Sequence, residues 1–547
     1  MRRLLIAVAI AGGALVALLL IAAAPPATAV DAPPGAAEVG EPAVEYSEDS
    51  SGARVTVPMK DNDYVPQTLT VDLDTIVVWD NEGRSNHNVI PDKLATGWKS
   101  KTIKPGRSFA QKLEDSGAIG YFCSLHGAPG KGMYGTLIVK NADGTVPTVK
   151  LDHSERPGAT GKPRTIRVPE DAKRIQTAVD KAPPGSMILI SPGVYREAVT
   201  VTTNRLVIRG LNRNKVILDG GFKLDNGIKV LGADGVAVEN MTARNYTENG
   251  FFWTDAIGYR GSYLTSTRTG DYAIYAFDSV KGLLEHSYGA GAPDAGFYIG
   301  QCYPCDSMIT DVIAEYNGLG FSGTNAGGNL IIKDSIWRYN RAGIVPNSGS
   351  GELNPPQHDA TVVGNLVYDN NNGKTPAIDA AILAQGNGIL VAGGEDNLIT
   401  HNQVYDHEVG GIALVLNPET TVWYANGNRV IDNVVGNSRE ADLAWFGGEG
   451  NCFADNEFET SKPSNIEAVL PCSGPGIEPT DALDLQKYID AQKPASVNYR
   501  TAKTPKPPRL PGMKNPKDAK ARPAVRIEID VDVESIRTPR LPRAARR

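Results

Sequence analysis

The chain has 547 residues, a formal charge of −7, 41% apolar residues and 21% charged residues. This composition excludes a wholly disordered chain and a multi-span membrane protein, and the net negative charge argues against nucleic acid as the main partner. The length allows about three domains, or one small domain beside one long one. The 58 glycines predict many turns and little long helix.

The first segment has the pattern of an export signal. Arg2 and Arg3 precede an apolar run over residues 4–24, which is followed by small residues that end at Ala29. Basic, apolar and small residues in this order predict a signal peptide over 1–29. The alternative is an uncleaved membrane anchor, because such a run is long enough to span a bilayer. Either way the rest of the chain is expected outside the cytoplasm, secreted or held in the periplasm or at the cell surface.

Composition divides the remaining chain into segments. Residues 30–50 are rich in Pro, Ala and acids and predict a disordered lead, and 143–163 predict a linker. Residues 476–500 are expected to form a C-terminal cap or helix. Residues 501–547 form a basic, Pro-rich tail with 13 Lys or Arg against 5 Asp or Glu. Such a tail either folds back on the acidic body, binds an anionic wall polymer, or is solvated.

Residues 51–142 combine short alternating strands with one cysteine, two histidines and a methionine. The strands predict a small β-sandwich. Cys123 and His126 lie in one short loop, Met133 follows them, and His87 comes from upstream. One thiolate, two imidazoles and a distant thioether are the ligand set of a blue-copper electron-transfer centre. The alternative is that Cys123 is a buried free thiol and the histidines are incidental.

This segment resembles the plastocyanin, pseudoazurin and halocyanin-like family of cupredoxins. The resemblance includes residues 64–66 (YVP) and the stretch TLTVDLDTIVVWDNEG that follows. It implies one type 1 copper site with His87, Cys123, His126 and Met133 as ligands. It also implies that Asn88, directly after the first histidine, braces the ligand loop through Ser124 and so holds the thiolate in place.

The third segment repeats. Gly or Ala followed by a large apolar residue recurs, beginning with Gly227-Ile228, and such pairs start at 227, 250, 273, 296, 320, 343, 388 and 411. The first five intervals are 23 or 24 residues, whereas the step from 343 to 388 is 45, either two turns or one turn with an insertion. Apolar residues alternate within each unit, which excludes helical repeats and predicts a solenoid with three short strands per turn.

Two further patterns fit this solenoid. Asn365, Asn402 and Asn433 each follow a short apolar strand and predict a ladder of stacked side chains that satisfies backbone groups in the turns. Residues 175–179 predict a short amphipathic helix that caps the first coil. Over 164–475 these residues resemble the right-handed parallel β-helix family, with its pectin-lyase-like fold, and copper-maturation periplasmic proteins built from the same repeats.

The expected fold class is therefore all-β: an N-terminal cupredoxin β-sandwich plus a C-terminal right-handed parallel β-helix solenoid. Two disulfides are predicted to staple the solenoid, Cys302–Cys305 and Cys452–Cys472. A redox or metal role for the C-x-x-C pair is the alternative, but no βαβ context supports it.

The residues after the repeat anchors predict an outward-facing column that contains Phe252, Tyr275 and Tyr298. An exposed aromatic row is a candidate platform for a glycan, and the alternative is a stacked ladder without a ligand. Nearby carboxylates, of which Asp255, Asp278 and Glu352 are the candidates, have the chemistry of a lyase or a hydrolase. Their spacing singles out no pair.

Three functions remain open from the sequence. The first, which we favour, is a secreted blue-copper protein whose β-helix is a docking scaffold for a polysaccharide or a protein partner. The second is a carbohydrate-active enzyme (polysaccharide lyase, hydrolase or epimerase) with an attached redox module. The third is a copper-handling or maturation protein. We further expect a redox partner of unidentified type, a monomer, calcium as a second cofactor of the β-helix, no nucleic acid, and membrane contact only if the signal segment is retained.

Overall fold

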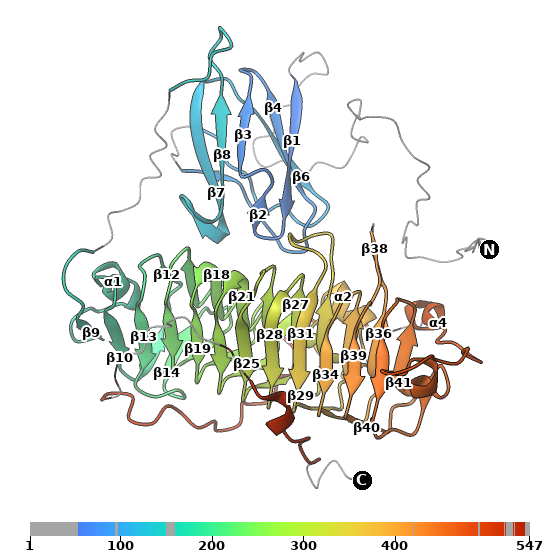
Figure 1. Ribbon diagram of the computed structural model, residues 1–547. Helices are drawn as coiled ribbons and strands as arrows, with labels where there is room; N and C mark the ends of the chain where they lie inside the picture. Colours follow the sequence, from blue (N-terminus) through green and yellow to red (C-terminus); the bar gives the residue numbers. More distant parts are fainter. Residues whose placement is uncertain are drawn as a thin grey trace. The chain divides into compact units, whose positions relative to one another are not determined.

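The computed structural model describes residues 53–92, 97–148, 159–419, 421–490, 493–518, 520, 529 and 531–541. The predicted signal peptide and the lead over 30–50 lie outside these residues, as does the middle of the predicted linker. Within the described residues, strands dominate and helices are short (Figure 1). None of these helices combines the length and the apolar character needed to cross a bilayer.

The N-terminal domain is a sandwich of two four-stranded sheets, ordered β2-β1-β4-β6 and β3-β8-β7-β5. Alternating apolar residues such as Val57 and Met59 point into its core, where they are fully buried with Trp79. The strands are β1 (Arg54–Lys60), β2 (Asp63–Tyr64), β3 (Thr68–Val71), β4 (Ile76–Asn81), β5 (Ile90–Pro91), β6 (Ser108–Lys112), β7 (Gly117–Ala128) and β8 (Lys131–Val139).

The hairpin of β7 and β8 contains a large bulge. Phe122 pairs with Tyr134 and Gly127 pairs with Gly132, so four residues of β7, 123–126, lie opposite one residue of β8, Met133. Such an excess of residues on one strand bends the strand and re-aims its side chains. The bulge contains Cys123 and His126, the two candidate ligands of this strand.

The second domain is a parallel β-helix whose strands stack into three long sheets (Figure 1). The first sheet has 12 strands: β9 (Thr165–Val168), β10 (Met187–Ile190), β13 (Val207–Gly210), β16 (Ala237–Glu239), β19 (Arg260–Ser262), β22 (Leu283–Glu285), β25 (Ser307–Thr310), β28 (Gly327–Lys333), β31 (His358–Val363), β34 (Leu398–Thr400), β39 (Arg429–Ile431) and β42 (Cys452–Ala454).

The second sheet has 10 strands: β11 (Gly193–Tyr195), β14 (Val216–Asp219), β17 (Thr242–Arg244), β20 (Thr265–Thr267), β23 (Tyr288–Ala290), β26 (Ile313–Glu315), β29 (Ile336–Arg338), β32 (Leu366–Tyr368), β35 (Gln403–Tyr405) and β40 (Val434–Gly436). The third has 11: β12 (Val199–Val201), β15 (Ile228–Leu231), β18 (Phe251–Ile257), β21 (Ile274–Val280), β24 (Ala295–Gly300), β27 (Leu319–Thr324), β30 (Ala342–Asn347), β33 (Ile389–Ala392), β36 (Gly410–Val415), β41 (Ala441–Phe446) and β43 (Ser461–Lys462).

Short elements complete the described chain. They are α1 (Ile175–Asp180), α2 (Asp379–Leu383), α3 (Ile466–Val469), α4 (Leu485–Asp490), the 3-10 turn η2 (Val533–Ser535), and a small ribbon of β37 (Asn417–Pro418) and β38 (Val422–Trp423). Helix α1 is the capping helix predicted at the first coil, with Ile175, Ala178 and Val179 buried. Helix α4 lies within the predicted C-terminal cap.

The register of the third sheet confirms the sequence repeat. Ile228 pairs with Phe251, and each later anchor pairs with the next along the sheet. Ile344 pairs directly with Ile389, so the 45-residue step is one turn with an insertion rather than two turns. The anchor side chains fill the interior of the helix and are fully buried.

Asparagine ladders run through the turns, as predicted. Asn402 is fully buried. Its side-chain nitrogen donates to the Asn433 side chain and to two backbone carbonyls, and its oxygen accepts from Asn365.

Leucine has a volume similar to that of asparagine but none of these polar groups, so Asn402→Leu leaves several buried polar atoms of the ladder without partners. We expect it to lower the free energy of unfolding by about 3 kcal/mol, measured by urea denaturation.

The matched control for the ladder is Asn214→Ala. This side chain is exposed and donates one hydrogen bond, to the carbonyl of Leu510, so its loss is expected to change the stability by less than about 0.5 kcal/mol. Equal effects at positions 214 and 402 would contradict a structural role for the ladder.

Both predicted disulfides are present. Cys302 is bonded to Cys305, and Cys452 to Cys472. Cys123 is the remaining cysteine and is a buried free thiol. The two bridges are compatible with an extracytoplasmic location, because disulfides persist in oxidising compartments.

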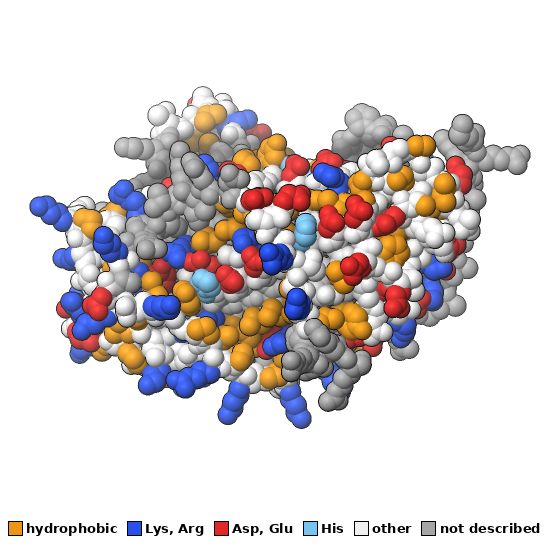
Figure 2. Space-filling model, turned by 60° about the horizontal axis from the view of Figure 1, so that its bottom comes forward, with side chains coloured by type: hydrophobic (Ala, Val, Ile, Leu, Met, Phe, Trp, Pro, Cys, Tyr) orange, Lys and Arg blue, Asp and Glu red, His pale blue; other side chains and the backbone are white. Residues whose placement is uncertain are grey.

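The described part of the basic tail lies along the β-helix. Arginines of the helix donate to tail carbonyls: Arg213 to Pro511 and Arg209 to Pro516. The face in Figure 2 carries side chains of both signs, not a uniformly acidic surface. The tail is therefore folded back, as one of the sequence alternatives has it, and hydrogen bonds to its backbone contribute to holding it there.

Candidate metal centre

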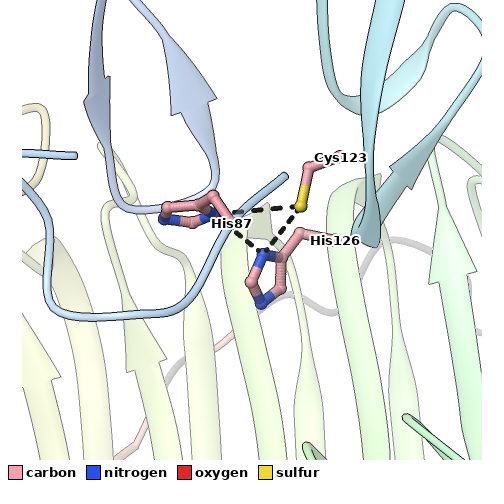
Figure 3. A group of neighbouring side chains, drawn as sticks. All are labelled: His87, Cys123 and His126. Carbon is pink, nitrogen blue, oxygen red and sulfur yellow. Dashed lines mark hydrogen bonds between the residues drawn. The ribbon is translucent and has the colours of Figure 1, made fainter. Parts of the chain in front are cut away.

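Three side chains converge at the end of the sandwich. The sulfur of Cys123 lies 3.9 Å from Nδ1 of His87 and 3.7 Å from Nδ1 of His126, and the two Nδ1 atoms are 3.2 Å apart. Figure 3 shows the three groups pointing toward one another. All three are fully buried, as is Met133. Among the described residues this is the one group of three or more Cys, His, Asp or Glu side chains with donor atoms close enough to hold a metal ion.

Each side chain is positioned by the local backbone. His87 lies in the loop after β4 and forms a two-way backbone bridge with Ile103. Cys123 and His126 project from the bulge of β7. Gly127 permits the close return of β8, because a Cβ there would lie 2.4 Å from the carbonyl oxygen of Met133.

Asn88 braces the ligand loop in the way that the resemblance of this domain to cupredoxins implies. Its side-chain oxygen accepts from the backbone N–H of Ser124 at 2.9 Å, and its nitrogen donates to the Ser124 hydroxyl at 3.0 Å. Its own backbone N–H points at the Cys123 sulfur, 3.4 Å away. The sulfur therefore receives a weak hydrogen bond, which favours its anionic form.

The electrostatics of the site favour a thiolate. Burial alone would raise the pKa of Cys123, but the contacts with His126 and His87 hold it well below its usual value. Burial would likewise lower the pKa of His87, yet the neighbouring Asp61 and Cys123 raise it to about 9. Burial lowers the pKa of His126. A thiolate and a neutral imidazole are metal ligands, and metal binding at His87 displaces the proton of this imidazole.

The chemistry of this donor set fits copper. A soft thiolate with two imidazoles suits both copper oxidation states. Met133, which the sequence predicts as the weak fourth ligand, is fully buried. Residues 53–140 match the family model of copper binding proteins, plastocyanin/azurin family. The N-terminal domain is a plastocyanin-like copper-binding domain. Residues 226–423 match the right-handed β-helix family model, so the chain fuses this domain to a β-helix.

Relatives match each part separately. The plastocyanin-like domain is 29% identical over 86 residues to plastocyanin of Scenedesmus fuscus, covering 14% of this chain and 86% of that protein. It is 31% identical over 87 residues to chloroplastic plastocyanin of Chlamydomonas reinhardtii, covering 14% of this chain and 59% of that protein. The A-module of the Azotobacter vinelandii mannuronan C-5 epimerase AlgE6 covers 53% of this chain and 95% of its own, at 15% identity and a TM-score of 0.40.

Residues of the β-helix border the plastocyanin-like site. The rings of Phe252 and His126 form a T-shaped pair, with centroids 6.0 Å apart and planes at 88°. Lys229 and Asn226 donate to backbone carbonyls of the ligand loop. The sequence predicted an outward-facing column that contains Phe252 but gave no indication that this column meets the loop, and it pointed to neither Lys229 nor Asn226 as a contact of the loop.

The aromatic column forms as predicted but is not exposed. Phe252 and Tyr275 are stacked, 4.8 Å apart and nearly parallel, whereas Tyr298 lies 4.8 Å from Tyr275 with its ring plane turned by 65°. All three are at most 2% exposed. The plastocyanin-like domain contacts Phe252 through the ring of His126 and Tyr275 through Asn62, which donates to the Tyr275 hydroxyl at 2.8 Å. Tyr298 donates to the buried Glu352 of the β-helix. The prediction of an open glycan platform is therefore wrong.

The candidate catalytic carboxylates occupy two environments. Asp255 and Asp278 are exposed on the adjacent strands β18 and β21. Glu352 is buried and accepts from the Tyr298 hydroxyl at 2.5 Å, and burial raises its pKa well above the usual value. Glu352 is thus a buried group bound by Tyr298, not a carboxylate on an open cleft.

The brace at Asn88 leads to a testable expectation. Asn88→Ala removes both hydrogen bonds to Ser124 while leaving all four candidate ligands in place. Such supporting groups typically contribute 10–100-fold to metal affinity, so we expect copper affinity to fall by roughly that factor in competition with a chelator. Asn141→Ala, on an exposed turn of the same domain, is the control. Unchanged affinity in Asn88→Ala would contradict the bracing role.

Proposed function

We propose that the protein is an extracytoplasmic one-electron carrier with a single type 1 copper site. The observation that carries the proposal is the convergence of His87, Cys123 and His126 in a fully buried, braced loop. Met133 is the proposed axial ligand. Copper bound there supplies one-electron redox chemistry.

The protein's own residues suit electron transfer better than metal delivery. Asn88 fixes the loop, so little rearrangement accompanies a change of charge at the site. Full burial of the donor atoms excludes water and competing ligands. A carrier that releases its metal to a partner needs an accessible, easily exchanged ligand, and the four proposed ligands are all enclosed.

A copper titration of the purified protein tests this proposal. We expect one copper per chain, an intense visible band from the thiolate, and reversible bleaching on addition of one electron per copper. The Cys123 thiol is expected to become unreactive to alkylation once copper is bound. A colourless complex, or copper binding that leaves Cys123 reactive, would refute the type 1 assignment.

For the β-helix we propose a docking scaffold for a polysaccharide or a protein partner. The closed aromatic column favours this role over catalysis at that position, since the candidate platform is occupied by the plastocyanin-like domain.

To test this role, the full chain is incubated with acidic and neutral polysaccharides, with and without Ca²⁺. Both the retention of the protein on the polysaccharide and the release of cleavage products are followed. Binding without turnover is the expected result for a polysaccharide partner. Unsaturated or reducing-end products would establish the carbohydrate-active alternative instead.

The copper-handling alternative is tested by metal transfer. The copper-loaded protein is mixed with a copper chelator, and the loss of visible colour is followed. An electron carrier with enclosed ligands is expected to lose copper slowly, whereas rapid release under native conditions would favour a role in copper delivery.

A further inference from the structure

The ligand loop is held by the β-helix as well as by its own domain. The ammonium of Lys229, on β15, donates to the carbonyl of Ser124 at 2.5 Å. The amide nitrogen of Asn226, just before the same strand, donates to the carbonyl of Leu125 at 3.1 Å. Ser124 and Leu125 are the two residues between the ligands Cys123 and His126, so both backbone carbonyls of this loop are bound from outside.

The β-helix also covers the imidazole of His126. Phe252 and His126 are both fully buried, and their rings form a T-shaped pair. An ideal Cβ placed on Gly132, next to Met133, would lie 3.1 Å from the Thr254 methyl group. The strands β7, β8, β15 and β18 therefore pack around the site from two domains, and water is excluded from His126 by a side chain outside the plastocyanin-like fold.

Lys229 places a positive charge at this boundary. Its side chain is 8% exposed, and its ammonium also contacts a carboxylate oxygen of Asp225 at 3.1 Å. A nearby cation disfavours the more positive of two metal oxidation states by Coulomb repulsion. Exclusion of water acts in the same direction, since the more highly charged state loses more hydration.

We propose that Asn226, Lys229 and Phe252 of the β-helix are positioning residues of the copper centre, which is built from both domains. They hold the ligand loop, exclude water from His126 and raise the reduction potential. This inference rests on the proposed electron-carrier function. Reduction adds one electron to Cu(II), taken in the test below from ferrocyanide, which is oxidised to ferricyanide.

The first test isolates the charge of Lys229. Lys229→Gln keeps a hydrogen-bond donor and removes the charge, whereas Lys229→Arg keeps the charge. In Lys229→Gln the equilibrium constant with the ferricyanide/ferrocyanide couple is expected to shift roughly tenfold toward Cu(II), about 59 mV for one electron, while Lys229→Arg stays within about threefold of wild type. Equal potentials in all three proteins would overturn the electrostatic role.

The second test needs no copper. In the apoprotein Cys123 is enclosed, so Phe252→Ala is expected to raise the rate at which a thiol reagent modifies it by about tenfold or more. Tyr405→Ala, on β35 of the second sheet, is the control for general loosening of the β-helix and should leave the rate unchanged. An unchanged rate in a folded Phe252→Ala protein would contradict the covering role.

The third test joins the two domains by an engineered disulfide. A Cβ at Gly232 would lie 3.6 Å from the Cβ of Lys131, within the 3.5–4.5 Å range of disulfides. Lys131→Cys/Gly232→Cys is expected to form a cross-link on mild oxidation, with Cys123 still protected and the potential equal to that of Lys131→Ala. Failure of a folded double variant to cross-link would overturn the two-domain centre, whereas a cross-linked protein that never turns blue would instead refute the electron-carrier function.

Discussion

Cys123→Ser is expected to abolish the visible colour and most of the copper affinity. Serine preserves the size of the side chain, but its hydroxyl oxygen is a hard and neutral donor, whereas the buried thiol of Cys123 has its pKa lowered by both histidines and is available as a soft anion. Copper bound to the folded protein also stabilises it by mass action. The variant should therefore lose the rise in melting temperature that copper produces in the wild type.

The control removes two other cysteines. Cys302→Ser/Cys305→Ser takes away one disulfide far along the chain from the ligands, and it should retain one copper and the wild-type visible spectrum. If Cys123→Ser bound copper with the same stoichiometry and the same spectrum, the assignment of this residue as the ligand would be wrong.

Breaking the ion pair of Arg209 and Glu239 is expected to produce the largest loss of stability. Nε of Arg209 lies 2.6 Å from Oε2 of Glu239, and both side chains are wholly buried. Glu239→Met leaves the Arg209 charge enclosed without its carboxylate, and such losses cost about 3–5 kcal/mol. The measurement is the free energy of unfolding of the β-helix in urea.

A double variant separates the pair from its parts. Arg209→Met/Glu239→Met removes both charges and replaces them with apolar volume, so most of the lost stability should return. Arg209 also donates to the tail carbonyls of Pro516 and Lys520, and limited proteolysis of the tail should therefore become faster in the double variant. A double variant no more stable than Glu239→Met would show that the charge pair is not the cause.

The sequence repeat predicted the coil register correctly because each coil obeys a local rule. A small residue must precede a large apolar residue wherever the chain turns into the third sheet, and Gly250 shows why: a Cβ there would lie 2.0 Å from the Ser266 hydroxyl oxygen. The gap between 343 and 388 stayed ambiguous, because an insertion leaves the anchors intact and changes only their spacing.

The site was predictable to the extent that one strand and one loop define it. The close spacing of Cys123, His126 and Met133 reflects the bulge of β7 opposite β8, and Asn88 directly follows a ligand. The exposure of Phe252, Tyr275 and Tyr298 was mispredicted, because it depends on contact between segments about 200 residues apart. No periodicity in either domain encodes that contact.

The C-terminal segment is recognised through atoms that every amino acid carries. Arg209 and Arg213 bind carbonyl oxygens of the tail, and Asn240 accepts from the backbone N–H of Met513. Substitutions of tail side chains should therefore be tolerated as long as the backbone keeps its path, and the prolines favour an extended one. We therefore expect a tag or an epitope to be tolerated at tail positions whose side chains make no contact with the β-helix.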